Sequence, residues 1–310
     1  ITASNGSSTT TITVTARDQF NNLISGATVA LASTGTGNAF AADNGSTNGS
    51  GVFSTTFSST VAESKTISAT VNSVAITQTA AVTVTPAAVS AAQTTITSNA
   101  SSISTDGSAT ITVQAKDQFG NNLTASGGTV VLSTTLGALT AVTDNTNGTY
   151  TATLTSTNTG SATISGSVAG NAITDTEVVT VTAGGASLTT SQVTAAPTSI
   201  TAGTNSTITV QLRDASNNPL TAGAGTVELA VSGVGSVGAV TNNNDGTYTA
   251  TYTSNATGSA TISATLNSQA ITDDASVTVT PAAVSAAQTT ITSNLASIVA
   301  GTNATITVQA

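Results

Sequence analysis

The segment ATITVQA at residues 109–115 decides the fold, because apolar and polar side chains alternate along it without a break. A period of two puts successive side chains on opposite faces of a β-strand, whereas a helix would need a period near 3.6. The alternation continues at 130–132, 149–155 and 162–168. Turn residues separate these runs, as at Asp106-Gly107, Gly120-Asn121 and Asn147-Gly148. We therefore expect short strands with one apolar face, and no part of the chain predicts an amphipathic helix.

The centre of that segment, Thr-Ile-Thr-Val, occurs four times along the 310 residues. Its isoleucines are Ile12, Ile111, Ile208 and Ile306, and they lie about 98 residues apart, which indicates tandem repeats of one structural unit. A longer identity links residues 85–99 to residues 280–294. We interpret it as recent duplication of a two-repeat unit within a longer array.

Each repeat has the pattern of a small all-β domain. In the second repeat we expect strands near residues 89–97, 109–116, 128–135, 138–143, 148–156, 160–168 and 172–182. About seven short strands in one repeat predict an immunoglobulin-like Greek-key β-sandwich. Pro86, Gly184-Gly185 and Pro281 mark short linkers between sandwiches.

The predicted organisation is therefore a set of tandem sandwiches joined by short linkers. They are repeat 1 at residues 1–85 without its first strand, repeat 2 at 86–182, repeat 3 at 183–280 and the start of repeat 4 at 281–310.

Composition excludes several classes of function. Only 4 residues are Lys or Arg and the net charge is −9, so the chain lacks the basic surface that nucleic acid or an anionic membrane requires. No apolar run is long enough to insert into a membrane. The sequence has no His and no Cys, which removes the commonest general base and the thiolate ligands of metal sites. We expect neither an enzyme nor an organic cofactor.

Two motifs recur at matching places. One is a turn that reads RDQFNN at 17–22, KDQFGNN at 116–122 and RDASNNP at 213–219. The other is NGTYTAT at 147–153 and DGTYTAT at 245–251. In this order the motifs resemble bacterial immunoglobulin-like domains of the invasin/intimin type, over nearly the whole chain. The resemblance implies the stalk of a surface adhesin, secreted to the cell surface. The chain departs from the family in its very few charges and in having no lectin-like cap.

The recurring turn admits two interpretations. Asp18, Asp117 and Asp214 each follow the rare cation of their repeat. Calcium could bind there with help from amide oxygens, for which the candidates are Asn22, Asn122 and Asn218. The alternative is an Asx turn, in which the carboxylate accepts backbone N–H groups. The adjacent cation disfavours a metal, so we favour the turn.

Other acidic and aromatic positions also admit more than one interpretation. Asp273 and Asp274 could bind calcium near a domain end, but as neighbours at the start of a strand their side chains should point opposite ways. Asp144 and the pair Asp175 with Glu177 are further acidic positions. Equivalent aromatic positions are Phe53, Tyr150 and Tyr248. We expect these rings in the core, with each tyrosine hydroxyl bonded to the backbone; stacking against a sugar is the alternative.

Two classes of function remain open. One is a structural stalk or filament whose partners are neighbouring copies of the repeat or chain. The other is a ligand-binding adhesin module that recognises a glycan or a host protein through its loops. A spacer beside an enzyme is a third, weaker option.

The ends of the chain also allow two hypotheses. The chain could be a piece of a continuous array whose targeting segments lie elsewhere, or its tail could complete the first sandwich of the next copy. We favour the first, because the tail carries a second Thr-Ile-Thr-Val strand that repeat 1 does not need.

Overall fold

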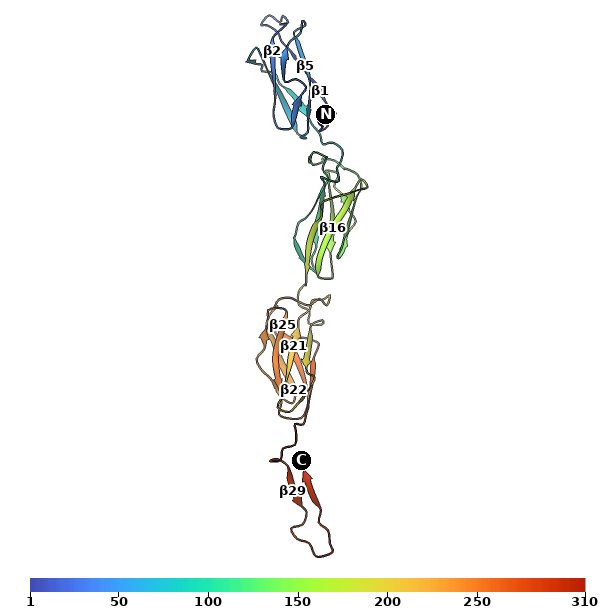
Figure 1. The fold of residues 1–310 in the computed structure, drawn as a ribbon, viewed down its shortest axis with the longest axis vertical. Coiled ribbons are helices and arrows are strands. Elements are labelled where there is room, and N and C mark those ends of the chain that lie inside the picture. The colour runs from blue at the N-terminus through green and yellow to red at the C-terminus, as the bar shows by residue number, and fades with distance from the viewer. Residues whose placement is uncertain (310) are drawn as a thin grey trace. The chain divides into compact units, whose positions relative to one another are not determined.

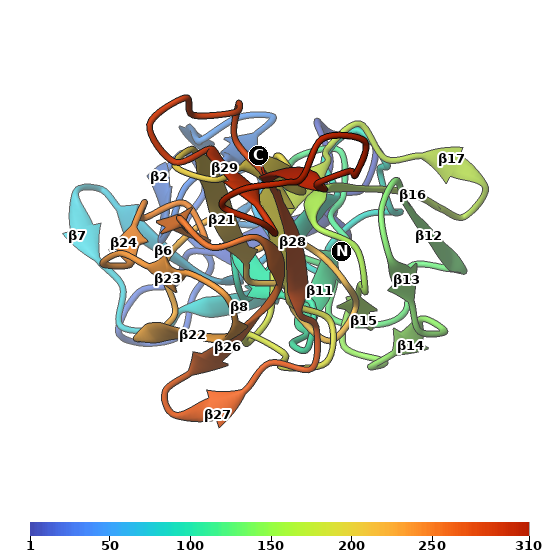
Figure 2. The ribbon, with the colours of Figure 1, turned by 90° about the horizontal axis from the view of Figure 1, so that it is seen from below.

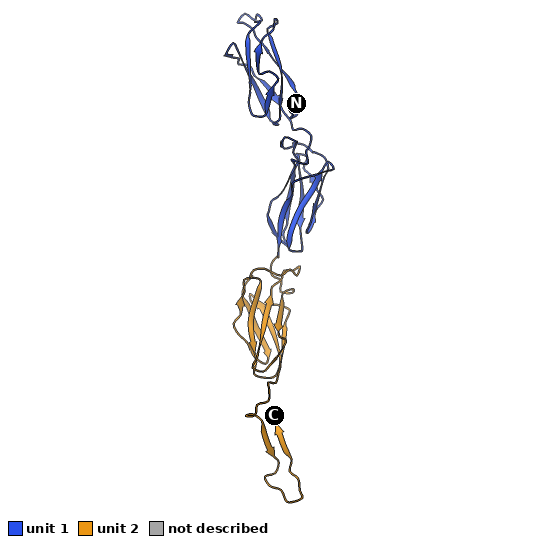
Figure 3. Cartoon of the chain, in the orientation of Figure 1, with its two compact units in different colours: residues 1–182 blue, residues 183–310 orange. Residues whose placement is uncertain are grey.

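The computed structural model describes residues 1–309 and consists of β-strands joined by turns and loops (Figure 1). The chain divides into two compact units, Ile1–Thr182 and Ala183–Ala310 (Figure 3). Within the described residues, no helix is long and apolar enough to span a membrane. The boundaries of the individual repeats stay predictions.

Repeat 2 is a sandwich of two sheets. The first sheet has the order β13 (Ala138–Leu139), β15 (Thr149–Thr155), β11 (Ala109–Gln114) and β9 (Thr95–Ser98), and β14 (Thr143–Asp144) also pairs with β15. The second has the order β10 (Ser102–Ser104), β18 (Glu177–Thr182), β16 (Gly160–Val168) and β12 (Val130–Thr134), and β17 (Asn171–Ala172) pairs with β16. Figure 2 shows β12, β16 and β17 close together, as their pairing requires. Ile111, Leu154 and Ile164 are fully buried between the sheets.

Three of the predicted strands of repeat 2 need correction. The first begins at Thr95 rather than near 89, because Thr94 bonds back to the Ser90 carbonyl through its amide (3.0 Å) and its hydroxyl (2.9 Å) and closes a turn. The strands expected at 138–143 and 172–182 are each split in two. The second split occurs where Asp175 leaves the sheet to bond to the amide of Ile96. Strand β10 was missed.

Repeat 3 has the same arrangement. Its first sheet has the order β19 (Gln192–Ala196), β21 (Asn205–Gln211), β25 (Thr247–Thr253) and β23 (Ser236–Val237), with β24 (Thr241–Asn242) on β25. Its second has the order β20 (Ser199–Thr201), β28 (Ala275–Thr280), β26 (Gly258–Leu266) and β22 (Val227–Gly233), with β27 (Gln269–Ala270) on β26. Ile208, Tyr252 and Ile262 are fully buried in the core.

Repeat 1 has one smaller sheet, of the order β1 (Thr10–Thr15), β5 (Val52–Ser59) and β3 (Asn38–Phe40). Its other sheet has the order β4 (Asn44–Ser46), β2 (Thr28–Ser33), β6 (Ser64–Val71) and β7 (Val74–Ala75), with β8 (Ala80–Thr83) on β6. The core falls into two separate clusters, around Phe53 and around Phe57. Beyond repeat 3, the described chain ends in a hairpin of β29 (Thr290–Ser293) and β30 (Ile306–Gln309).

This architecture confirms the predicted fold class: tandem all-β sandwiches of the immunoglobulin-like type, without helices in the described part of the chain.

Candidate functional site: the aspartate turns

The recurring Asp motif forms the same tight turn in all three repeats, directly after β1, β11 and β21. In repeat 1, Asp18 Oδ1 accepts the amides of Phe20 (2.9 Å) and Asn22 (2.8 Å), and Asp18 Oδ2 accepts the side-chain amide of Asn22 (2.9 Å). Asp214 holds Ser216 and Asn218 in the same way. The residue before the asparagine that bonds to the carboxylate has a positive φ in all three repeats, at Asn21, Gly120 and Asn217. The Asx-turn interpretation is therefore what the geometry shows.

Asp117 combines this turn with burial. Its side chain is 0% exposed, and four N–H donors bond to it. Three of the donors belong to its own turn; the fourth is the amide of Ala87, 2.9 Å from Oδ2, in the linker that leads into repeat 2. The Gly184 amide makes the equivalent bond to Asp214 Oδ2, at 3.1 Å. The turn therefore fixes the linker as well as itself.

Asn121 extends the contact to the preceding repeat. Its side-chain oxygen accepts the amide of Ala62 (2.9 Å), and its side-chain NH₂ donates to the Thr60 carbonyl (2.9 Å) and to Asp117 Oδ2 (2.7 Å). Ala62 and Thr60 lie in the loop between β5 and β6 of repeat 1. One amide thus joins the carboxylate of repeat 2 to the backbone of repeat 1.

The sequence interpretation named Asn122 as a candidate calcium ligand, which stays a prediction, but the asparagine that bonds to Asp117 is Asn121. Asn122 is exposed, and Asn121 makes the bonds. The signal that identifies the correct residue is the spacing of four between Asp and Asn, which repeats 1, 2 and 3 share. The extra asparagine in NN obscured it.

Electrostatics follow from these bonds. Burial raises the pKa of Asp117, but the hydrogen bonds from Asn121, Ala87 and Phe119 outweigh it and hold that pKa below its ordinary value. The side-chain and backbone bonds of Asn22 likewise lower the pKa of Asp18. The arginines that precede the aspartates in repeats 1 and 3 bond to the backbone of the turn. Arg17 donates to the Asn21 carbonyl (2.9 Å), and Arg213 donates to the Asn217 carbonyl (3.0 Å).

The other two candidate aspartates have different environments. Asp273 Oδ2 accepts the amide of Val193 at 2.8 Å and so ties β19 to the start of β28 in the opposite sheet. Asp175 makes the matching bond to Ile96, also at 2.8 Å. Asp274 is exposed, but it and Asp273 lie just before β28 rather than in the strand as the sequence predicted.

Calcium at Asp18, Asp117, Asp214, Asp273 and Asp274 stays a prediction. Four of these five carboxylates already accept N–H bonds, which a cation would have to displace. No cluster of three or more acidic residues that could hold a metal occurs in the described part of the chain.

The carboxylate of Asp273 can be tested with a neighbouring control. We expect Asp273→Ala to lower the free energy of unfolding of repeat 3 by about 1–2 kcal/mol, because the Val193 amide loses a charged hydrogen-bond acceptor. Hydrogen exchange measured by mass spectrometry should then show faster exchange in β19 first. Asp274→Ala should leave exchange unchanged, since that side chain is exposed. Equal effects of the two variants would contradict the strand-tying role.

The equivalent aromatic residues lie in the core, as predicted. Tyr150 is 1% exposed, and its hydroxyl accepts the amide of Gly127 at 2.8 Å. The Tyr248 hydroxyl donates to the Gly225 carbonyl at 2.8 Å. Buried rings cannot stack against a sugar. Sequence reasoning missed Tyr252, which is fully buried and donates to the Val234 carbonyl.

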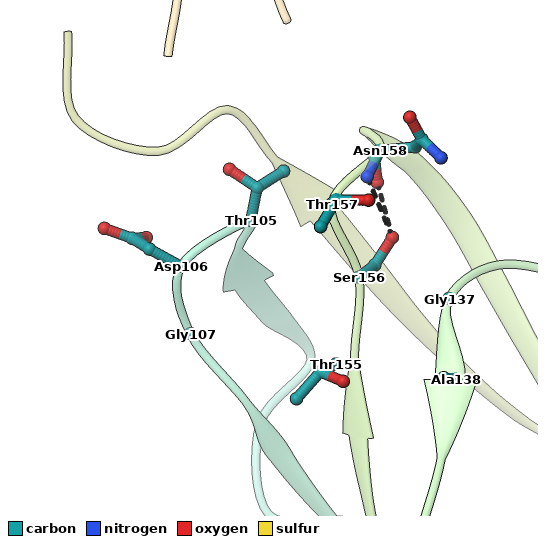
Figure 4. A pocket seen from close by; sticks show the side chains of 9 residues that line it. All are labelled: Thr105, Asp106, Gly107, Gly137, Ala138, Thr155, Ser156, Thr157 and Asn158. Carbon is teal, nitrogen blue, oxygen red and sulfur yellow. Dashed lines mark hydrogen bonds between the residues drawn. The ribbon is translucent and has the colours of Figure 1, made fainter. Parts of the chain in front are cut away.

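A hollow of about 440 Å³ lies at one end of repeat 2 (Figure 4). Its lining comes from the loops around Thr105, Asp106 and Gly137 and from the turn at residues 155–158. The Ser156 hydroxyl accepts the Asn158 amide (3.1 Å) and donates to the Asn158 carbonyl (2.8 Å), so it closes its own turn. The lining offers one carboxylate and no aromatic ring, and we assign it no chemistry.

The fold and the repeated turns define a tandem immunoglobulin-like repeat protein. The model of the family "Invasin, domain 3" matches residues 1–87, 90–184 and 187–282, and the chain belongs to that family. The structure of invasin, a bacterial integrin-binding protein, is similar with a TM-score of 0.52 and 25% identity over 94% of this chain. FdeC, an Escherichia coli adhesin, is similar with a TM-score of 0.54 and 26% identity over 88% of this chain.

The chain spans 59% of the invasin structure and 92% of the FdeC structure. No curated protein matches it significantly.

Proposed function

We propose that the chain is a structural segment of a stalk on the bacterial cell surface, without catalytic activity, in which the turn at Asp117 limits bending at the junction before repeat 2. The bridge made by Asn121 carries this proposal. It connects the Asp117 carboxylate, the linker at Ala87 and the backbone of the preceding repeat through hydrogen bonds between buried or half-buried groups. The linker is only a few residues long and is hydrogen-bonded to Asp117, which is itself connected to repeat 1 through Asn121. Such a linker should allow little bending between the two repeats.

The surface fits this role in two ways. Because charged residues make up only 5% of the chain, the stability of the stalk should depend little on ionic strength. The same low charge offers little repulsion between neighbouring copies, which we propose as its partners. Extracellular localisation is part of the proposal. It is supported by the family of the chain and by its similarity to a bacterial adhesin of known structure.

Asn121 and Asn122 form a matched pair for the test. We expect Asn121→Ala to free the Ala62 amide and the Thr60 carbonyl, so that the Ala62 amide exchanges at least tenfold faster and small-angle scattering shows a broader distribution of interdomain distances. Asn122→Ala removes an exposed side chain of the same type and should change neither. A rigid junction in Asn121→Ala would contradict the proposal.

The second candidate is an adhesin module that binds a glycan or host protein through its loops, suggested by the description of invasin as integrin-binding. Glycan and protein arrays probed with the whole chain distinguish the two. We expect no specific binding, because the turns are occupied by internal hydrogen bonds and the aromatic rings of repeats 2 and 3 are largely buried.

A further inference from the structure

Strand β12 is an outer strand of the second sheet of repeat 2, and one of its edges is unpaired. It pairs with β16 on one side, and no strand in the described part of the chain pairs with it on the other. The Thr135 amide donates to the Thr163 carbonyl, so alternate residues counted from Thr135 face β16. The N–H and C=O groups of Val130, Leu132 and Thr134 therefore face the unpaired side, which we call the β12 edge.

Repeat 1 covers the matching edge of β2. Its β4 pairs with β2, and the Asp43 carbonyl accepts the Leu31 amide at 2.7 Å. Leu31 corresponds to Leu132, because β2 pairs with β6 as β12 pairs with β16. In repeat 2 the segment after β13 forms β14, which pairs with β15 in the other sheet. The outward amide of Leu132 therefore has no strand to bond to among the described residues.

The other outer strands of repeats 2 and 3 are protected against pairing. β9 and β19 each present an outward amide, that of Ile96 in one and that of Val193 in the other. The carboxylates of Asp175 and Asp273 accept these amides at 2.8 Å. β10, β13 and their counterparts β20 and β23 are only two or three residues long. Very short edge strands and edge groups that are already bonded are poor templates for an added strand.

The counterpart of β12 in repeat 3 is β22, and it carries a charge. Its outer edge is also unpaired in the described chain, but the exposed Glu228 stands at the position of Val131. If β22 paired with its own copy around this residue, two carboxylates would lie side by side and repel each other. Val131 is apolar and 59% exposed. Among the outer strands of repeats 2 and 3, β12 alone is long, uncovered and uncharged.

The residues around Val131 are uncharged too. Thr129 and Ser133 lie on the same face of the sheet, and Ser165 and Ser167 of β16 lie beside them. Two copies can therefore approach along this edge without repulsion between like charges. An antiparallel pair is also self-complementary, since the same row of donors and acceptors serves on both sides of a two-fold axis.

We propose that the β12 edge pairs with the β12 edge of a second copy of this chain, antiparallel and with Val131 opposite Val131. In this register Val130 and Leu132 of the second copy exchange their backbone hydrogen bonds, and the two valines cover each other. The contact is isologous, so it joins two copies and then closes. It rests on the proposed function, because it specifies the surface through which neighbouring copies of the stalk segment meet.

Cross-linking tests the register, and the chain has no cysteine of its own to interfere. Residues opposite each other in a non-hydrogen-bonded antiparallel pair have Cα atoms about 4.5 Å apart, which a disulfide can span. We therefore expect Val131→Cys to form a disulfide-linked dimer under mild oxidation. Ser133→Cys is the control on the same face of β12, and it should stay monomeric because Thr129 of the second copy lies opposite it. Equal cross-linking of the two variants, or none in Val131→Cys, overturns the proposal.

Sedimentation of the whole chain tests the contact without a cross-link. We expect association that increases with concentration and that Val131→Glu weakens roughly tenfold, because two carboxylates replace an apolar pair. Val178→Glu is the matched control, since Val178 is 49% exposed on the outer face of the same sheet but lies on β18, away from the β12 edge. It should leave association unchanged. A chain that remains monomeric at every concentration, or equal effects of the two variants, overturns the proposal.

Hydrogen exchange resolved by residue locates the contact. At concentrations where the chain associates, the amides of Val130 and Leu132 should exchange about tenfold more slowly than in Val131→Glu. Unchanged exchange in β16 shows that Val131→Glu remains folded. Protection that appears in β9 or in repeat 3 instead overturns the proposal. The Asn121 measurements report on the junction within one chain, so a failure of the stalk function and a failure of this contact are distinguishable.

Discussion

Asp117→Ala should destabilise repeat 2 by about 3 kcal/mol, since four N–H groups lose a buried charged acceptor and water can reach only some of them. The effect should begin at the junction, because one of these donors belongs to the linker residue Ala87. Hydrogen exchange resolved by repeat is the suitable measurement. We expect faster exchange across residues 87–121 and then through the rest of repeat 2, with repeat 3 unaffected.

Asp18→Ala is the matched control, because Asp18 is exposed and, among the described residues, accepts hydrogen bonds only within its own turn. It should accelerate exchange only within its own turn. If Asp18→Ala and Asp117→Ala weaken their repeats equally, the stability would come from the local turn and not from the junction.

The same carboxylate predicts a pH dependence. The pKa of Asp117 is lowered in the folded state, so its contribution is complete above the unfolded value of 3.8 and is lost as the pH falls through the folded value. The free energy of unfolding of repeat 2 should therefore stay constant, as far as Asp117 is concerned, from neutral pH down to about the unfolded pKa. It should decrease by the contribution of Asp117 at lower pH. Asp117→Asn should remove this part of the acid dependence.

Glu63→Gln should destabilise repeat 1, with exchange about tenfold to a hundredfold faster in β6 and in the loop at residues 34–37. Lys65 is 0% exposed, and its ammonium pairs with the Glu63 carboxylate and donates to the Thr36 carbonyl at 2.6 Å. Losing Glu63 would leave a buried cation with one neutral acceptor. This pair also lowers the pKa of Glu63, chiefly through the hydrogen bond from Lys65.

The double variant Lys65→Met with Glu63→Gln provides the control. It replaces the buried charge with an apolar side chain of similar length, so most of the lost stability should return. Repeats 2 and 3 support this expectation, because Ala162 and Ala260 stand at the position of Lys65 and are buried in the core. If the double variant is as unstable as Glu63→Gln, the buried charge is not the cause.

These predictions have a common consequence for the proposed stalk. Its repeats are alike in fold but differ in what holds them: repeat 1 uses an ion pair where repeats 2 and 3 use apolar packing. Asp117 is buried where Asp18 is exposed. A force or a change of pH should therefore act on the repeats unequally.

The sequence by itself determined the strands, the repeats and the turn. Alternation along ATITVQA depends only on neighbours in the chain, and so does an Asx turn closed by Asp117 on the next few residues. The core position of Tyr150 followed from the same parity. Sequence reasoning was less successful at choosing between adjacent residues of the same type. Asn121 and Asn122 are both candidates to bond to Asp117, and the structure shows that Asn121, four residues after the aspartate, makes the bond.

The tertiary structure decided the contacts that join distant segments. Asn121 reaches Ala62 across 59 residues, and Asp273 reaches Val193 across 80. Such bonds depend on how two sheets pack and where a loop of the preceding repeat falls, which no local pattern encodes. The burial of Lys65 belongs to the same class. Alternation assigns each residue to a face of its own strand, and only the packed sheets determine what lies opposite that face.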